Sequence, residues 1–207
     1  MQTHTSLLLI RHAEVEAKYQ RVFGGKIDMN LSPNGQTQAA ELARWLKRQP
    51  IDDIYASPMQ RVQQTLAPLT TNGVPKPVIL PDLREVDFGD WTGLGWEQVQ
   101  EKFGVSAYKW LEELDRGAIR NAENGIGYRT RVEPCLRKIL HESARKNVAI
   151  FCHGGVIRML LAILLELPLP KMAAFEIDYA SVTRVVVFPH KTELQLLNFP
   201  PWREAGL

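Results

Sequence analysis

The sequence has 207 residues, 45% apolar and 23% charged, which is enough to bury a core and unlike the composition of a disordered chain. A net charge of only +2 and the lack of a Lys/Arg block argue against nucleic acid as a partner. The longest apolar stretch, residues 156–165, is about half of a membrane span, and neither a signal peptide nor a disulfide-like cysteine spacing is recognisable, so we expect a cytoplasmic protein with free thiols and no membrane partner.

Strands and helices alternate along the first half of the chain. Residues 6–10 are apolar throughout, which is typical of a strand covered on both faces of a sheet. Ser32 and Pro33 provide an N-cap and a first helical turn, and apolar residues then recur at helical spacing up to Leu46. The next predicted elements are a strand at residues 53–56, a helix that starts at Ser57 and Pro58 and runs toward Leu69, and a strand at residues 78–80.

The second half contains a segment of different character. Residues 85–130 are rich in Gly, Trp and charge and have weak periodicity, with a helix predicted near residues 96–114. We interpret them as an insertion, or lid, within one domain of residues 1–207. The elements after it are a helix at residues 131–144, a strand at 148–151, a helix at 156–165 and a hairpin of strands at 182–188 and 194–197. This alternation predicts a layered α/β domain with a mostly parallel sheet.

Chemically versatile residues follow the ends of the predicted strands. They are Arg11 and His12 after the first strand, Arg61 one turn into the helix after the second, Glu85 after the third, and His153, Gly154 and Gly155 after the fourth. Ligands of open α/β sheets bind outside the carboxyl ends of the strands, so we expect these residues to converge on one pocket.

The residue types in this pocket favour a phosphate group as the ligand. Guanidinium groups bind phosphate bidentately, and the Gly154-Gly155 start of a helix offers backbone N–H groups to an anion. A neutral imidazole can attack phosphorus, and a carboxylic acid can protonate the leaving oxygen. Taken singly, each residue has a plain structural alternative. The two histidines could also ligate a metal, although the arginines would repel a cation.

Five segments, in order, resemble the motifs of the histidine phosphatase superfamily, also called phosphoglycerate-mutase-like proteins. They are residues 9–14 (Leu-Ile-Arg-His-Ala-Glu), 25–35, 57–65, 83–93 and 151–158 (Phe-Cys-His-Gly-Gly-Val-Ile-Arg). The resemblance implies a three-layer α/β/α sandwich and no metal or organic cofactor. It also implies a role for each site residue: His12 is phosphorylated, Arg11, Arg61 and His153 hold the phosphoryl group, Glu85 donates a proton, and Lys18, Gly25 and Gly154 contribute to substrate binding.

Two positions depart from the family pattern. Ala13 stands where Gly is usual, so its methyl group either crowds the loop or requires a negative φ. Lys18 stands where many members have an Asn that contacts the phosphoryl group, and a lysine can bind phosphate as a point charge. Residues 121–125 match the family's Gly-Glu-Ser stretch only loosely.

The resemblance leaves three functions open. We expect a phosphomonoesterase that hydrolyses a small phosphorylated metabolite through a phosphohistidine on His12. A phosphoglycerate mutase is the alternative, but the segment after Gly93 lacks a Tyr/Arg-rich cluster and carries Trp96 and Trp110, which indicate a partly apolar lid. A non-catalytic binding module is disfavoured because the histidines, arginines and acid are all present. The partner is a small-molecule phosphoester, and a homodimer is left open.

Overall fold

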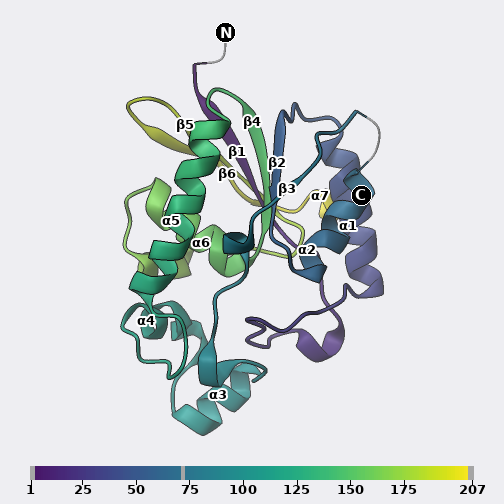
Figure 1. Ribbon diagram of the computed structural model, residues 1–207. Coiled ribbons are helices and arrows are strands. Elements are labelled where there is room, and N and C mark those ends of the chain that lie inside the picture. The colour runs from purple at the N-terminus through teal and green to yellow at the C-terminus, as the bar shows by residue number, and fades with distance from the viewer. Residues whose placement is uncertain (1–2, 71–72, 205–207) are drawn as a thin grey trace.

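A central sheet organises the computed structural model, which describes residues 3–70 and 73–204 (Figure 1). Its strands are β1 Thr5–Arg11, β2 Asp53–Ala56, β3 Val78–Ile79, β4 Asn147–Cys152, β5 Val182–Val187 and β6 Thr192–Phe199. Their order across the sheet is β3-β2-β4-β1-β5-β6. The first four in this order are parallel, and the hairpin of β5 and β6 joins β1 antiparallel. The prediction of a mostly parallel sheet is confirmed.

Helices cover both faces of this sheet, as the three-layer prediction requires (Figure 1). They are α1 Pro33–Leu46, α2 Gln60–Leu66, α3 Trp96–Phe103, α4 Trp110–Asp115, α5 Gly125–Glu142, α6 Gly154–Leu164 and α7 Pro201–Glu204. Strand β1 explains the layering, because its successive side chains point to opposite faces. Leu7 and Leu9 join the core with residues of α5 and α6, whereas Leu8 and Ile10 join the core with residues of α1 and α2.

The start of α1 is as predicted. Ser32 is the N-cap, its hydroxyl accepts a hydrogen bond from the Gly35 N–H at 2.9 Å, and Pro33 occupies the first turn. Gly35, in the first turn of α1, is required by close packing. A Cβ at this position would lie 2.0 Å from the carbonyl oxygen of Glu14, so only glycine lets the loop after β1 lie against the helix.

Three predicted helix boundaries are wrong. Helix α2 begins at Gln60 with Met59 as its N-cap, and it ends at Leu66 before a 3-10 turn, so Ser57 does not cap it. Helix α5 begins at Gly125, six residues before the predicted start, because the Asn124 side chain accepts a hydrogen bond from Gly127 N–H at 2.8 Å and caps it.

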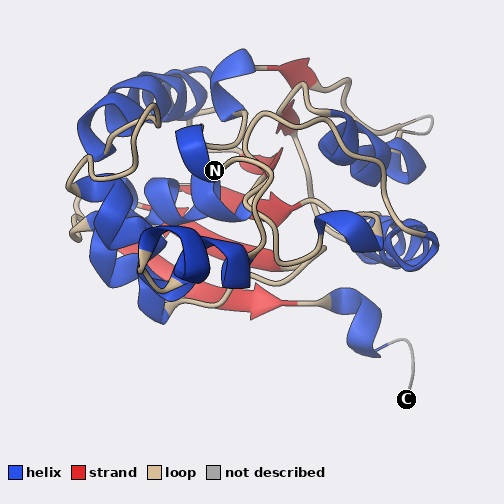
Figure 2. Cartoon of the chain, turned by 90° about the horizontal axis from the view of Figure 1, so that it is seen from below, coloured by secondary structure: helices blue, strands red, loops and turns tan. Residues whose placement is uncertain are grey.

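The predicted helix over residues 96–114 is two helices, α3 and α4. Gly104 ends α3 in the left-handed conformation, with φ of 70°, and a 3-10 turn precedes α4. Both helices lie beyond the carboxyl ends of the parallel strands, and Figure 2 looks onto this end of the sheet. Buried residues of the segment 85–130, among them Trp91 and Leu111, belong to the same core as Val132 of α5. Within the described residues, no helix is both long and apolar enough to cross a membrane.

Candidate active site

The two histidines that follow neighbouring strands lie side by side. Strands β1 and β4 are parallel and adjacent, with Arg11 opposite Cys152, so the residues after them, His12 and His153, meet at the same edge. Their ring centroids are 5.3 Å apart, and the backbone N–H of His12 donates a hydrogen bond to the Cys152 carbonyl at 3.1 Å. The pairing of the strands therefore fixes the distance between the rings.

The backbone sets the tautomer of His12. Its Nδ1 lies 2.9 Å from the carbonyl oxygen of Ala13, which can only accept, so Nδ1 carries the hydrogen and Nε2 keeps a lone pair. Burial lowers the pKa of His12 well below its usual value, and the positive charges of Arg61 and Arg11 lower it further. The side chain is 6% exposed and lines a cavity, so the structure presents a neutral imidazole with a free Nε2.

His153 is fully buried and neutral for the same reasons. Desolvation lowers its pKa well below the usual value, and the positive charges of Arg61 and Arg11 act in the same direction. Its Nε2 lies 2.9 Å from the Ser57 hydroxyl, which orients the ring. Ser57 follows β2, so three neighbouring parallel strands contribute to this pair of histidines and its support.

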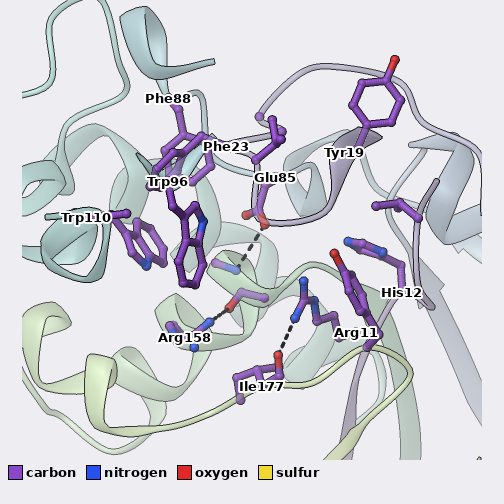
Figure 3. Close-up of a pocket in the computed structure, with 18 of the residues that line it drawn as sticks. Arg11, His12, Tyr19, Phe23, Glu85, Phe88, Trp96, Trp110, Arg158 and Ile177 are labelled. Atoms are coloured by element: carbon purple, nitrogen blue, oxygen red, sulfur yellow. Dashed lines mark hydrogen bonds between the residues drawn. The ribbon is translucent and has the colours of Figure 1, made fainter. Parts of the chain in front are cut away.

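Arg11 is held over the cavity from two sides. One terminal nitrogen donates to the carbonyl of Ile177 at 2.6 Å, and the guanidinium lies 4.0 Å from the centre of the Tyr179 ring (Figure 3). The Tyr179 ring also lies 5.7 Å from the His12 ring. The Arg11 Nε is buried without a hydrogen-bond partner among the described residues, so this donor is available to an anion.

Arg61 is 2% exposed, in the first turn of α2. Its terminal nitrogens donate to the carbonyls of Ile27 and Gly25, at 2.8 Å and 3.3 Å, which ties the loop after β1 to the helix. Gly25 adopts φ of 48° there, and a Cβ would lie 3.2 Å from the Thr92 hydroxyl. Burial lowers the pKa of Arg61, while Glu85 and Asp28 oppose that shift. The buried guanidinium lines the cavity and keeps its positive charge, which favours an anionic ligand there.

Glu85 reaches the cavity from the loop after the 3-10 turn Pro81–Leu83. One carboxylate oxygen accepts from Val86 N–H at 3.0 Å, and the other from Gly155 N–H at 3.3 Å. A Cβ on Gly155 would lie 2.4 Å from a Glu85 oxygen, so the glycine makes room for the acid. Gly154 begins α6 beside it, and this helix N-terminus faces the cavity.

The structure does not bring Lys18 to the other predicted residues. Its side chain is 65% exposed, its amine lies 3.7 Å from a Glu16 carboxylate oxygen, and it is not among the residues that line the cavity. Ala13 keeps a negative φ, and its methyl group is buried with the α1 and α2 core. Its N–H donates to the Thr65 hydroxyl at 2.8 Å, so alanine fits without strain.

One cavity is lined by Arg11, His12, Arg61, Glu85 and Gly154, and its volume of about 410 Å³ is in the range of small-molecule sites. Figure 3 shows Arg11, His12 and Glu85 pointing toward one space, with Trp96 and Trp110 across from them. Two groups of the site, the Tyr179 ring and the Ser57 hydroxyl, are not among the residues predicted from the sequence. Ser57 lies in the motif of residues 57–65, whereas Tyr179 lies in none of the five motifs. Among the described residues, no group of three or more His, Cys, Asp or Glu side chains could hold a metal ion.

Curated relatives of this chain include proteins named as phosphatases. Phosphoserine phosphatase 1 of Hydrogenobacter thermophilus is 28% identical over 93% of this chain and 91% of its own length. The adenosylcobalamin/alpha-ribazole phosphatase of Salmonella typhimurium is 28% identical over 93% of this chain and 95% of its own.

Solved structures of similar fold cover nearly the whole chain. The alpha-ribazole phosphatase of Shigella flexneri has a TM-score of 0.80 at 25% identity, over 93% of this chain and 96% of its own. A mycobacterial glucosyl-3-phosphoglycerate phosphatase in complex with VO3 has a TM-score of 0.80 at 26% identity, over 94% and 98% of the two chains. The family model of the histidine phosphatase superfamily (branch 1) matches residues 7–200. With this match over nearly its whole length, the chain belongs to branch 1 of the histidine phosphatase superfamily.

Proposed function

We propose that the protein is a phosphomonoesterase that hydrolyses a small phosphorylated metabolite through a phosphohistidine on His12. One observation carries the proposal. The neutral, tautomer-fixed His12 lies in one cavity with two arginines and a carboxyl group, and His153 adjoins it. Phosphoryl transfer requires charge neutralisation and positioning above all, and this arrangement provides both.

In the first step, the substrate phosphoryl group lies among Arg11, Arg61 and the N-terminus of α6, with His153 beside it. His12 Nε2 attacks phosphorus, the bond from phosphorus to the ester oxygen breaks, and Glu85 gives its proton to that oxygen. In the second step, Glu85 takes a proton from water, and the resulting hydroxide attacks phosphorus. The bond from phosphorus to His12 Nε2 breaks, inorganic phosphate leaves, and His12 returns to its neutral form.

The relatives support hydrolysis over the two alternatives. Those named above carry phosphatase names, and a phosphoglycerate mutase is not favoured by a cavity whose far side is aromatic. A binding module would need no aligned nucleophile and acid. We further propose that residues 85–130 act as a lid and that the protein works in the cytoplasm, which is supported by two buried, unpaired thiols, Cys135 and Cys152.

The phosphohistidine can be tested by rapid quenching. Purified protein that is mixed with a 32P-labelled phosphoester and quenched in base should retain a covalently bound label, which acid then removes. The His12→Ala variant should retain no label, and its kcat should fall at least about 10³-fold. His141→Ala is the matched control, because His141 is exposed on α5. A His12→Ala variant with full turnover would refute the mechanism, and faster interconversion than hydrolysis of phosphoglycerates would favour the mutase.

A further inference from the structure

The cavity extends from the phosphoryl-binding groups to a wall of aromatic rings. The members of this aromatic wall all line the cavity, and they are Phe23, Phe88, Trp96, Tyr108 and Trp110. The rings support one another: centroids are 4.9 Å apart for Phe23 and Phe88, 5.4 Å for Phe88 and Trp110, and 5.1 Å for Trp96 and Tyr108. Figure 3 shows Trp96 and Trp110 across the cavity from His12.

Trp96, Trp110 and Tyr108 form the more exposed part of the wall. Phe23 and Phe88 are 5% and 6% exposed and form the layer behind, whereas Trp96 and Trp110 are half-buried. Indole rings with one open side gain free energy when a second ring stacks on them, because apolar area leaves water and the ring quadrupoles match in offset or edge-to-face contact.

Charges around the wall do not suit a second anionic group on the ligand. Three cations that are not among the lining residues are paired with carboxylates: Lys18 with Glu16, Arg21 with Glu97 and Lys26 with Asp87. The terminal nitrogens of Arg158 donate to the carbonyls of Gly154 and Phe175. Glu176 adds negative charge to the lining, whereas the carboxylate of Asp178 is paired with Arg203. Beyond the phosphoryl site, the remaining cation among the described lining residues is Arg158, whose Nε is buried without a hydrogen-bond partner. The negative charge of Glu176 acts on this guanidinium, so a carboxylate on the leaving group would meet little net positive charge there.

We propose that the substrate is a phosphomonoester whose alcohol carries a flat aromatic ring without negative charge, and that this ring stacks on Trp96 and Trp110. The inference rests on the proposed function, because the phosphoryl group must occupy the His12 end for the rest of the substrate to reach the wall. A cavity of about 410 Å³ holds a phosphoryl group together with one or two rings.

The test separates ring recognition from leaving-group reactivity. The full chain is assayed with 2-phenylethyl phosphate and butyl phosphate, whose alcohols are of similar basicity, and with O-phosphoserine and 3-phosphoglycerate as anionic leaving groups. We expect kcat/KM for 2-phenylethyl phosphate to be about tenfold higher than kcat/KM for butyl phosphate. The difference from kcat/KM for each of the two anionic esters should be larger still. Equal values for the phenylethyl and butyl esters, or preference for an anionic ester, would overturn the inference.

Variants locate the preference on the wall. Trp96→Leu and Trp110→Leu should each reduce the ratio of kcat/KM for the phenylethyl ester to kcat/KM for the butyl ester about threefold or more. Trp45→Leu is the matched control, because Trp45 is also half-buried but packs with Phe199 beside the α1 core, away from the cavity. An unchanged ratio in both cavity variants would refute the role of the wall. Failure to hydrolyse any ester would refute the proposed function itself, whereas hydrolysis of all esters without preference would refute this inference alone.

Discussion

Glu85 and Gly155 form a close pair in which a side chain occupies the space that a methyl group would take. The expected result of Gly155→Ala is a displaced acid, because its Cβ would lie 2.4 Å from the Glu85 carboxylate. We expect kcat to fall about 10²-fold with alkyl phosphates and much less with 4-nitrophenyl phosphate, whose leaving group needs no proton.

Gly154→Ala is the control for that substitution. Its Cβ would lie 3.4–3.6 Å from side-chain atoms of Arg158 and Arg11. Contacts of this length are close to ordinary van der Waals contacts, and small movements of these long side chains can relieve them. Steady-state kinetics on the two esters distinguish the cases. Equal losses on both esters for Gly155→Ala would contradict a role confined to the acid.

Ala13 supports a second prediction, since the usual residue of the family there is glycine. Its φ is negative and its methyl group is buried in the core of α1 and α2. Ala13→Gly should therefore lower the free energy of unfolding by about 1 kcal/mol, through a lost buried methyl and a more flexible unfolded chain. Urea unfolding measures this change. Because the Ala13 N–H and C=O keep their partners, activity should stay within about twofold.

Some site residues could be predicted from the sequence and others could not. His12, His153, Arg61 and Glu85 follow strands whose apolar runs are plain, so sheet topology predicts that they converge. Tyr179 packs on Arg11 only because the loop before β5 turns back, with Ala180 N–H bonded to the His12 carbonyl at 3.1 Å. A contact set by long-range loop geometry leaves no periodic signal in the sequence.

At the scale of elements, the strands were easier to predict than the helix ends. Runs such as β1 and β4 are apolar on both faces, which leaves little choice of structure. The start of α5 was missed because Gly125 and Gly127 are poor helix formers, whereas the Asn124 cap and tertiary packing outweigh that preference. The break at Gly104 depends on one residue with positive φ inside a segment of mixed periodicity.

That break between α3 and α4 gives a prediction for the proposed lid. A Cβ at Gly104 would meet no atom within 4 Å, so Gly104→Ala costs only the left-handed backbone penalty, about 1 kcal/mol. Gly104→Asn should cost less, because asparagine tolerates this conformation. Hydrogen exchange of residues 96–115 should accelerate in the order Gly, Asn, Ala. Identical exchange in all three would show that the cap does not limit opening of this segment.

At the scale of the whole molecule, buried neutral histidines make folding depend on pH. The pKa values of His12 and His153 are lowered in the folded state, while the unfolded chain has the usual value near 6.5. Below about pH 6.5 the unfolded state therefore binds more protons, so stability falls as pH falls, by up to about 2.7 kcal/mol per pH unit for two such groups. Above that pH neither state is charged, and this dependence ends.

Urea unfolding between pH 7.5 and 5 measures the effect, and His12→Asn should remove about half of the slope. The carboxylates of Asp53 and Asp87 have lowered pKa values and act in the same direction, but they titrate only in the more acidic range, below about pH 4. If the stability of the wild-type protein does not change down to pH 5, the imidazoles gain protons as readily in the folded chain as in the unfolded chain.

The position of β1 between β4 and β5 also bears on how the enzyme is made on the ribosome. Its register pairs residues 5–11 with residues 147–152 and 182–187, so no neighbouring strand exists until about 140 further residues have been synthesised. At about 5–20 residues per second, this apolar strand spends roughly 7–30 s without a partner. The strand that precedes the proposed nucleophile, His12, is thus translated early and assembled late. A nascent chain arrested before Val182 should bind hydrophobic-segment chaperones and have no phosphatase activity.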